Sequence, residues 1–328
     1  MDLEEFLAEW HNDSPYVRVH TSGSTGVPKS MLVEKRRMEA SARITCEFLG
    51  LKAGDSALLC LPLDYIAGKM MVVRALTCGL RLISVAPSGT PKWKGPIDFA
   101  AMVPMQVWNL LQLSDGRERL MQIRHLIIGG GAIDSALASA LKDFPNHIWS
   151  TYGMTETLSH IALRRLNGPE ATAYYTPFEG VHLSQDEEGC LIIDAPAVHD
   201  GLLITNDIAE IQPPLQSEGA GGRPRFRILG RRDNVICSGG IKIQAEEVER
   251  VLHPHLKAPF CITKRKDPKL GEAVVLLTED NDISALKTLC EQELPHYWRP
   301  RYYISVAKIP LTGTGKIARK EAEALASA

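Results

Sequence analysis

Hydrophobic and polar positions along the first half of the chain predict strands and helices in alternation. Short apolar runs are typical of buried strands, and stretches with an apolar residue every three or four positions are typical of helices. We expect strands at 16–20, 57–61, 82–85, 99–103, 125–128 and 148–152, and helices at 2–11, 34–49, 66–78, 104–113 and 135–141. Because strands and helices alternate, we expect a mostly parallel sheet with helices on both faces and ligands at the carboxyl ends of its strands.

The pattern changes after about residue 172. Short apolar runs separated by turns predict a β-rich subdomain with strands at 181–183, 190–193, 202–204 and 226–229, while the Pro- and Gly-rich stretch 212–225 predicts a loop. A compact α+β tail follows, with helices at 245–252 and 283–294 and strands at 261–263, 273–277 and 302–306. The expected fold class is therefore α/β, with a large N-terminal domain (1–232) and a small C-terminal domain (233–328).

Composition narrows the functional classes. The chain has 328 residues, of which 45% are hydrophobic and 23% charged, and its net charge of −2 argues against nonspecific nucleic-acid binding. The acidic N-terminus does not resemble a signal peptide, and no apolar run is long enough to cross a membrane. The seven cysteines never form C-x-x-C, which favours reduced thiols in the cytoplasm over a disulfide framework or a zinc site.

The segment after the first predicted strand is rich in small and hydroxyl residues. It reads Thr21, Ser22, Gly23, Ser24, Thr25, Gly26, Val27, Pro28 and Lys29. Backbone N–H groups, hydroxyls and a lysine together form a cradle for polyphosphate. A P-loop is excluded because Pro28 stands where that motif needs a glycine. A plain surface loop remains the other interpretation.

Five later segments carry further candidate chemistry. They are Gly129–Gly131, Thr151–Glu156, Thr205–Asp207, Gly230–Gly240 and Pro310–Ile317. Glu156 can hold Mg²⁺ with the Thr155 hydroxyl nearby, and Asp207 can accept hydrogen bonds from two ribose hydroxyls. Lys316, on a Gly/Thr loop, can stabilise negative charge that develops on a carboxylate and a phosphate. Taken singly, each segment could be an ordinary turn, helix cap or surface cluster.

The six segments, in this order, resemble the signatures of the adenylate-forming superfamily of acyl-CoA synthetases, luciferases and peptide-synthetase adenylation domains. The resemblance implies catalytic roles for Thr155, Glu156 and Lys316, with Glu156 on the metal, and a hinge at Asp233. It implies ATP or CoA contacts from the phosphate-loop residues Thr21–Gly26 and Lys29 and from Gly129, Gly130, Gly131, Tyr152, Asp207, Arg231, Gly239 and Gly240. ATP, Mg²⁺ and CoA are the cofactors and co-substrate that it implies.

This sequence departs from the superfamily pattern in four places. Ser30, Asn206 and Gln244 replace a Gly, a Gly and a frequent Pro, and these changes are mild. The portion before the phosphate loop is much shorter than usual, which puts the acyl pocket in doubt.

Within the superfamily, the segment Leu61–Gly68 and the downstream Arg74 resemble the o-succinylbenzoate–CoA ligases of menaquinone biosynthesis, with Tyr65 in place of a His. The resemblance implies a small carboxylic acid as the partner and makes Arg74, Tyr65, Ser159 and His160 candidate acid contacts. An acid with two carboxylates needs a cation or donors for the one that is not activated. Structural roles for Arg74 and His160 remain open.

Three other functions remain open at this stage. The chain could ligate another aryl or acyl acid, or load the pantetheine of a carrier protein. It could also be a nucleotide-binding regulatory protein that lacks the ligase reaction. The sequence predicts no oligomeric state.

Overall fold

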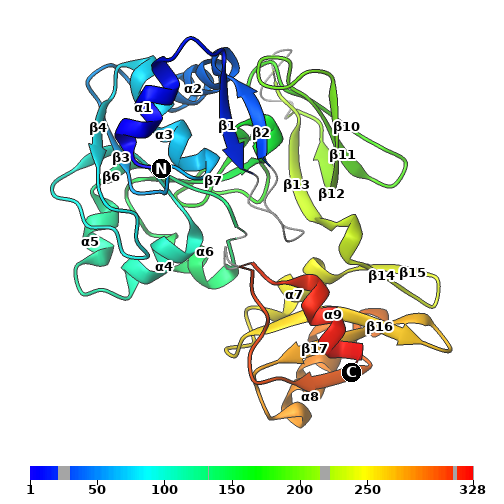
Figure 1. Ribbon diagram of the computed structural model, residues 1–328. Coiled ribbons are helices and arrows are strands. Elements are labelled where there is room, and N and C mark those ends of the chain that lie inside the picture. Colours follow the sequence, from blue (N-terminus) through cyan, green and yellow to red (C-terminus); the bar gives the residue numbers. More distant parts are fainter. Residues whose placement is uncertain (21–29, 132, 215–221, 313–315, 328) are drawn as a thin grey trace.

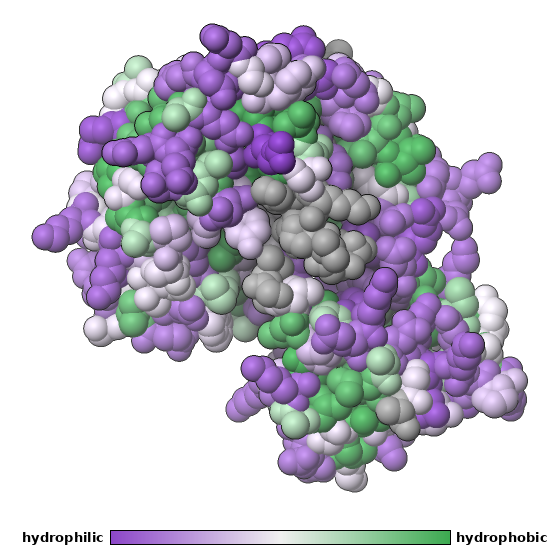
Figure 2. All heavy atoms as spheres, in the orientation of Figure 1, coloured by the Kyte–Doolittle hydropathy of each residue, from purple (hydrophilic) through white to green (hydrophobic). Residues whose placement is uncertain are grey.

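The computed structural model describes residues 1–20, 30–131, 133–214, 222–312 and 316–327. Two lobes are visible in Figure 1: the elements up to β13 form the larger lobe, and those from β14 onward form the smaller one, where the chain ends. Hydrophilic residues dominate the face in Figure 2, and apolar residues gather there in small separate patches. Within the described ranges, no helix is long and apolar enough to cross a membrane.

A seven-stranded sheet organises the larger lobe and confirms the predicted α/β class. Its order is β4-β3-β5-β6-β7-β8-β9, and the pairs from β4 to β7 are parallel. The strands are β3 (Ser56–Leu59), β4 (Arg81–Ser84), β5 (Ile97–Met102), β6 (Ile123–Ile128), β7 (His147–Gly153), β8 (His160–Arg165) and β9 (Thr176–Pro177). β8 and β9 run antiparallel and were not predicted; β9 is only two residues long.

Helices cover both faces of this sheet through two separate apolar cores. They are α2 (Lys35–Leu49) and α3 (Ile66–Cys78) on one side, and α4 (Pro104–Leu111), α5 (Gly116–Met121) and α6 (Ser135–Leu141) on the other. Gly50 and Gly79 end α2 and α3 with φ of 64° and 67°, a left-handed conformation that favours glycine. The Asp134 side chain accepts a hydrogen bond from Leu137 N at 2.7 Å and caps α6.

The N-terminal elements pack on α3. α1 (Leu3–His11) buries Phe6 and Trp10, and its Glu9 pairs with Lys69 Nζ of α3 at 3.2 Å. Lys69 is only 2% exposed and also donates to the Arg18 carbonyl at 2.9 Å, so the buried ammonium is fully engaged. β1 (Tyr16–His20) pairs antiparallel with β2 (Ser30–Glu34), a hairpin partner that the sequence pattern did not predict.

A second, antiparallel sheet follows the order β10-β11-β12-β13. Its strands are β10 (His182–Gln185), β11 (Cys190–Asp194), β12 (Leu202–Gln212) and β13 (Arg225–Arg231). β12 extends well beyond the predicted 202–204, because polar residues occupy its second half. This extension pairs Asp207 with Arg231 across β12 and β13.

The smaller lobe contains its own five-stranded sheet and core. The strands are β14 (Val235–Ser238), β15 (Ile241–Gln244), β16 (Phe260–Asp267), β17 (Gly271–Thr278) and β18 (Tyr302–Ser305), and the helices are α7 (Ala245–Leu252), α8 (Ile283–Glu293) and α9 (Arg319–Ser327). β14, β15 and α9 were not predicted. Gly239 and Gly240 form the tight β14–β15 turn with φ of 58° and 85°. The predicted domain boundary between residues 232 and 233 remains a prediction.

Two stacked histidines at the start of β6 and β7 generate a stability prediction. The rings of His125 and His147 lie 4.8 Å apart, and burial, aided by the charge of His147, lowers the pKa of His125 to about 4. A histidine in an unfolded chain titrates near 6.5, so protonation favours the unfolded state and stability falls as pH drops from about 6.5 toward 4. We expect His125→Leu to flatten the fall in unfolding free energy between pH 7 and 5, measured by urea denaturation.

The exposed His182 on β10 provides the matched control. His182→Leu should leave the pH dependence of the unfolding free energy as it is in the original chain. Identical slopes for His125→Leu and the original chain would contradict the assignment.

Candidate active site

The predicted phosphate loop connects β1 to β2. Its residues Thr21, Ser22, Gly23, Ser24, Thr25, Gly26 and Lys29 all lie outside the described residues. The strands on either side are in register, with His20 opposite Ser30. The hairpin therefore holds the two ends of this segment next to each other.

The glycine turn after β6 packs closely against the end of β7. A Cβ atom on Gly129 would lie 2.3 Å from the Thr151 hydroxyl oxygen, so only glycine fits there. Gly130 has φ of 78°, and a Cβ on Gly131 would meet Pro104 at 3.5 Å. The turn thus lies at the carboxyl edge of the parallel strands, where the predicted adenine contact belongs.

Tyr152 and Asp207 are joined by a direct hydrogen bond. The Tyr152 hydroxyl donates to Asp207 Oδ2 at 2.8 Å, and its ring, 9% exposed, packs edge-on against Phe226 with centroids 5.1 Å apart. Burial raises the pKa of Tyr152, and the Asp207 carboxylate raises it further. Tyr152 is therefore a neutral phenol that orients the carboxylate, a contact that sequence reasoning did not predict.

Arg231 links the two aspartates that the sequence marked for different roles. Its guanidinium lies 3.4 Å from Asp207 Oδ1 and 3.1 Å from Asp233 Oδ2, and Asn206 Nδ2 donates to Asp233 at 3.5 Å. Asp233 belongs to η3 (Arg232–Asn234), the short 3₁₀ turn that connects β13 to β14. The predicted ribose contact and the predicted hinge residue thus share one cation.

Lys316 lies in a loop of the smaller lobe, and its ammonium interacts electrostatically with Arg231 and Asp207. Its loop is closed by an isolated bridge between Leu311 and Ile317 and by a 2.7 Å hydrogen bond from Thr312 N to the Lys316 carbonyl. Burial lowers the pKa of Lys316, and Arg231 lowers it further, whereas Asp207 opposes the shift. The Lys316 side chain still remains exposed in part. Lys316 therefore lies within electrostatic range of Arg231 and Asp207, although neither of these two described side chains forms a direct bond with the Lys316 ammonium.

Thr155 and Glu156 occupy η1 (Thr155–Thr157), the turn directly after β7. His199 Nδ1 donates to the Glu156 carbonyl at 3.2 Å and braces this turn from the segment before β12. Sequence reasoning missed His199, because its partner is a backbone atom 43 residues away.

Among the described residues, no cluster of three or more His, Cys, Asp or Glu side chains could hold a metal. The carboxylate of Glu156 and the hydroxyl of Thr155 are oxygen donors, which fit Mg²⁺. Mg²⁺ is commonly held by one or two carboxylates together with substrate phosphates. The residues present fit that arrangement better than an all-protein metal cage.

Arg74 is a buried cation that is only partly satisfied. It is 2% exposed, and it donates to the Ser159 hydroxyl oxygen at 2.5 Å, while its buried Nε has no acceptor in the described part of the chain. Burial lowers the pKa of Arg74 to about 10, so it stays charged at neutral pH. No carboxylate among the described side chains forms an ion pair with it. Because a buried charge without a counter-ion is costly, an anionic ligand would stabilise it.

Two other predicted acid contacts, His160 and Tyr65, lie in different surroundings. His160 is 8% exposed, and its ring nitrogens lie 3.2 Å from the Ser159 and Thr45 hydroxyl oxygens. Tyr65 is 44% exposed at the N-terminus of α3, nine residues before Arg74. That separation corresponds to about 13 Å along the helix. The structure therefore groups Arg74, Ser159 and His160 and leaves Tyr65 apart.

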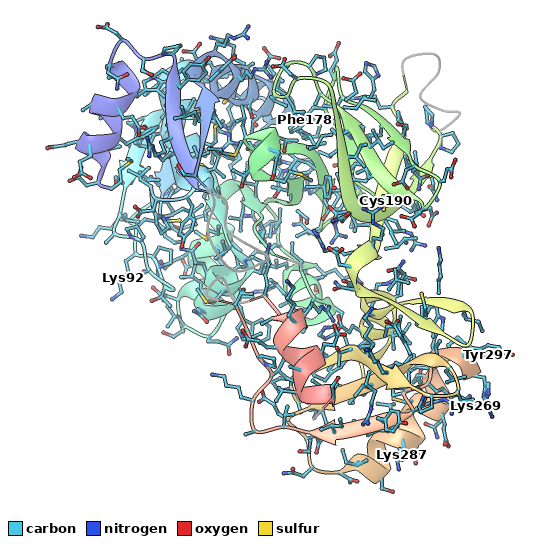
Figure 3. The ribbon with its side chains drawn as sticks, turned by 45° about the vertical axis from the view of Figure 1, so that its right-hand side comes forward. Lys92, Phe178, Cys190, Lys269, Lys287 and Tyr297 are labelled. Atoms are coloured by element: carbon cyan, nitrogen blue, oxygen red, sulfur yellow. The ribbon has the colours of Figure 1, made fainter. Side chains whose placement is uncertain are left out.

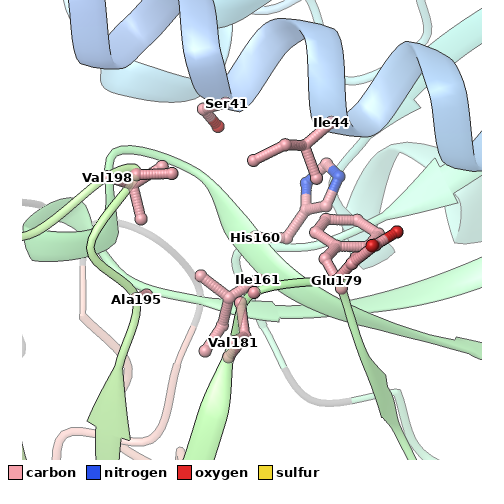
Figure 4. A pocket seen from close by; sticks show the side chains of 11 residues that line it. Ser41, Ile44, His160, Ile161, Glu179, Val181, Ala195 and Val198 are labelled. Atoms are coloured by element: carbon pink, nitrogen blue, oxygen red, sulfur yellow. The ribbon is translucent and has the colours of Figure 1, made fainter. Parts of the chain in front are cut away.

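His160 also borders a small cavity beneath α2 (Figure 4). The cavity measures about 20 Å³ and is mostly apolar, with Ser41, Ile44, Ile161 and Val198 among its lining residues. This volume holds about one water molecule. The cavity is too small to be the whole pocket for an aromatic acid.

The comparisons place the chain among known proteins. The model of the family described as "AMP-binding enzyme" matches residues 4–192, more than half of the chain. The chain belongs to the AMP-binding enzyme family. The matched region contains Gly129–Gly131, Tyr152 and Glu156.

Curated relatives include several enzymes with one name. The 2-succinylbenzoate–CoA ligase of Salmonella typhimurium is 26% identical over 320 residues, covering 92% of this chain and 66% of the ligase. The enzyme of the same name from Listeria monocytogenes is 25% identical over 344 residues, covering 97% of this chain and 71% of the ligase. The chain thus spans about two thirds of the length of these relatives.

Solved structures share the fold. An acyl-CoA synthetase (AMP-forming)/AMP-acid ligase II-like protein from Dyadobacter fermentans is 33% identical with a TM-score of 0.65, and the match covers 97% of this chain and 91% of that one. The o-succinylbenzoate CoA synthetase of Bacillus subtilis, in complex with its acyl-adenylate intermediate, has a TM-score of 0.74 at 20% identity. That match covers 93% of this chain and 68% of the synthetase.

The depressed pKa of Lys316 predicts selective reactivity. A larger fraction of its amine is neutral near pH 8 than for an ordinary lysine, so an acylating reagent at limiting concentration should modify Lys316 first. Lys92, which projects from the outer edge of the larger lobe (Figure 3), is the internal comparison. Peptide mass spectrometry after brief treatment should show faster labelling at Lys316. Equal labelling of the two lysines would contradict the depressed pKa.

Proposed function

We propose that this chain is an ATP-dependent acid–thiol ligase that works through an acyl-adenylate and passes the acyl group to CoA. The bonded group of Tyr152, Asp207 and Arg231, with Lys316 in electrostatic range of it, is the observation that carries the proposal. It joins residues from the two lobes at the carboxyl edge of the sheet, beside the glycine turn. The names of the curated relatives favour 2-succinylbenzoate as the acid.

The charges of this group match a nucleotide. Asp207, held by Tyr152, accepts hydrogen bonds from the ribose hydroxyls of ATP. Arg231 and Lys316 repel each other, and a phosphate between them relieves that repulsion. The superfamily resemblance assigns further phosphate contacts to the segment Thr21–Lys29, which lies outside the described residues.

The first half-reaction forms a mixed anhydride. A carboxylate oxygen of the acid attacks the α-phosphorus of ATP, a new P–O bond forms, and the bond to the β-phosphate oxygen breaks as pyrophosphate leaves. The carboxylate and the α-phosphate, both anionic, must come into contact, and negative charge passes to the phosphate oxygens and the departing pyrophosphate; Lys316 stabilises the charge at the α-phosphate. Glu156 and Thr155 hold Mg²⁺, which neutralises phosphate charge when it is bound.

The second half-reaction forms the thioester. The CoA sulfur attacks the acyl carbon, a C–S bond forms, the C–O bond to the phosphate breaks, and AMP leaves while the thiol proton passes to solvent. We infer that the smaller lobe turns about Asp233, because this residue lies between β13 and β14, and that Lys316 withdraws. The Gly239–Gly240 turn then leaves room for the pantetheine arm.

The second carboxylate of the acid binds Arg74. The partly unsatisfied guanidinium and its lack of a carboxylate partner support this assignment. Ser159, which Arg74 contacts, follows Glu156 by three residues, so this subsite adjoins the predicted metal site. ATP and CoA are cytoplasmic metabolites, and we therefore place the reaction in the cytoplasm.

Each alternative function predicts a different assay result. A ligase for a different acid would release pyrophosphate with that acid and not with 2-succinylbenzoate. A carrier-protein ligase would transfer the acyl group to a phosphopantetheinyl protein instead of CoA. A nucleotide-binding regulatory protein would bind ATP without any acid-dependent release of pyrophosphate.

Lys316→Ala should separate the two half-reactions. We expect acid-dependent ATP–pyrophosphate exchange to fall by about 100-fold or more, because an ammonium aimed at developing charge is lost. Thioester formation from supplied acyl-adenylate should change by less than about threefold, since that step does not use Lys316. Lys320→Ala, which alters an exposed lysine four residues on, is the control and should retain both activities. Equal loss of both half-reactions in Lys316→Ala would refute its role.

Arg74 variants should affect the acid and spare the nucleotide. We expect Arg74→Gln to raise the KM for 2-succinylbenzoate by about 100-fold, because a charge-assisted bidentate contact is lost, and to change the KM for ATP little. Arg74→Lys keeps the charge, so its KM for 2-succinylbenzoate should lie between that of the original chain and that of Arg74→Gln. Arg43→Gln, on the exposed face of α2, is the matched control. A larger change for ATP than for the acid would exclude Arg74 from the acid subsite.

A further inference from the structure

His160 is the buried titratable group that the proposed reaction does not use. It starts β8 beneath α2, with its ring edge-on to Phe178 at 5.5 Å. Both ring nitrogens are engaged by hydroxyls, so neither is left to contact a substrate. The ring must therefore act on the acid subsite through its neighbours.

The hydroxyl protons determine which nitrogen of His160 carries hydrogen. Thr45 donates its hydroxyl proton to the Ser41 carbonyl at 3.0 Å within α2, so its oxygen accepts from His160 Nε2–H. His160 Nδ1 is then an acceptor and takes the hydroxyl proton of Ser159. The Ser159 oxygen in turn accepts from Arg74. The hydroxyl protons of Thr45 and Ser159 and the ring N–H of His160 then all have acceptors.

The reverse direction is less favourable. If His160 Nδ1 carried the hydrogen, Ser159 would accept from both His160 and Arg74, and its own proton would find no acceptor in the described ranges. A half-buried donor without a partner is costly, whereas a fully satisfied network is rigid. Burial and the charge of Arg74 lower the pKa of His160 well below its usual value, which keeps the ring neutral.

We propose that His160 is a positioning residue: as the Nε2–H tautomer it takes the Ser159 proton, turns the Ser159 oxygen toward Arg74, and so fixes the guanidinium that binds the second carboxylate of the acid. This inference rests on the proposed function and deepens it. Ser159 is an acceptor for Arg74 rather than a donor to the acid. The remaining N–H groups of Arg74, including the unpartnered Nε, meet the carboxylate.

The selectivity of the ligase follows from this chain of hydrogen bonds. An acid with a second carboxylate depends on the orientation of Arg74, while an acid with one carboxylate does not. Loss of His160 should therefore weaken the dicarboxylate specifically, and a general loosening of the pocket would weaken both acids alike.

Two variants of His160 test this role by steady-state kinetics. His160→Leu removes the acceptor, and we expect the KM for 2-succinylbenzoate to rise about tenfold while the KM for ATP and kcat stay within about twofold. His160→Asn supplies an amide oxygen near the position of Nδ1 and should restore much of the affinity. The KM for 4-oxo-4-phenylbutanoate, which lacks one carboxylate, should not change. His182→Leu, at an exposed site on β10, is the control.

An equal rise in KM for both acids, or no rescue by His160→Asn, would overturn the positioning role. If the original chain does not act on 2-succinylbenzoate, the choice of acid in the proposed function fails instead. A second measurement then decides the inference without any substrate. ¹⁵N NMR of histidine, with His160 assigned through His160→Asn, should show the neutral Nε2–H tautomer at pH 6. A Nδ1–H or a protonated ring would overturn the inference.

Discussion

The Asp207 carboxylate is the group on which the rest of the active site depends. Tyr152 holds it from β7 and Arg231 holds it from β13, and the field of Lys316 reaches it from the smaller lobe. Arg231 pairs with both Asp207 and Asp233, while burial, aided by the charge of Arg231, lowers the pKa of Lys316. We propose that the phosphates of a nucleotide bind beside the guanidinium of Arg231 and the ammonium of Lys316.

Arg74 of α3 forms a separate cationic site. Arg74 is buried, and no carboxylate among the described side chains pairs with it. Ser159 and His160 lie just after the turn that contains Glu156. Ser159 accepts a hydrogen bond from Arg74, and His160 contacts Ser159. We propose that the group around Asp207 and Arg231 binds the nucleotide and that Arg74 binds the acid. The shared turn explains how one chain can bring the acid close to the α-phosphate, since positioning supplies much of the rate in such transfers.

Local features of the fold could be predicted from the sequence, and long-range contacts could not. Glycines at positions 50 and 79 end helices where expected, because left-handed backbone at a helix end favours glycine. The strand Ser30–Glu34 was missed because its apolar pattern is weak. The bond from Tyr152 to Asp207 spans 55 residues, and nothing in either local sequence specifies it. The partners of His160 likewise come from α2 and from the residue before it, so its tautomer follows only from the assembled structure.

The central claim is that one ATP is bound between the two lobes and is cleaved at its α-phosphate by a carboxylate. The most direct test is a single-turnover assay with 2-succinylbenzoate and ATP in the absence of CoA. Without CoA, we expect a burst of about one pyrophosphate per chain, with the acyl-adenylate retained on the protein. Once CoA is added, AMP should be released and turnover should continue. Release of ADP and phosphate, or no dependence on any carboxylic acid, would contradict it.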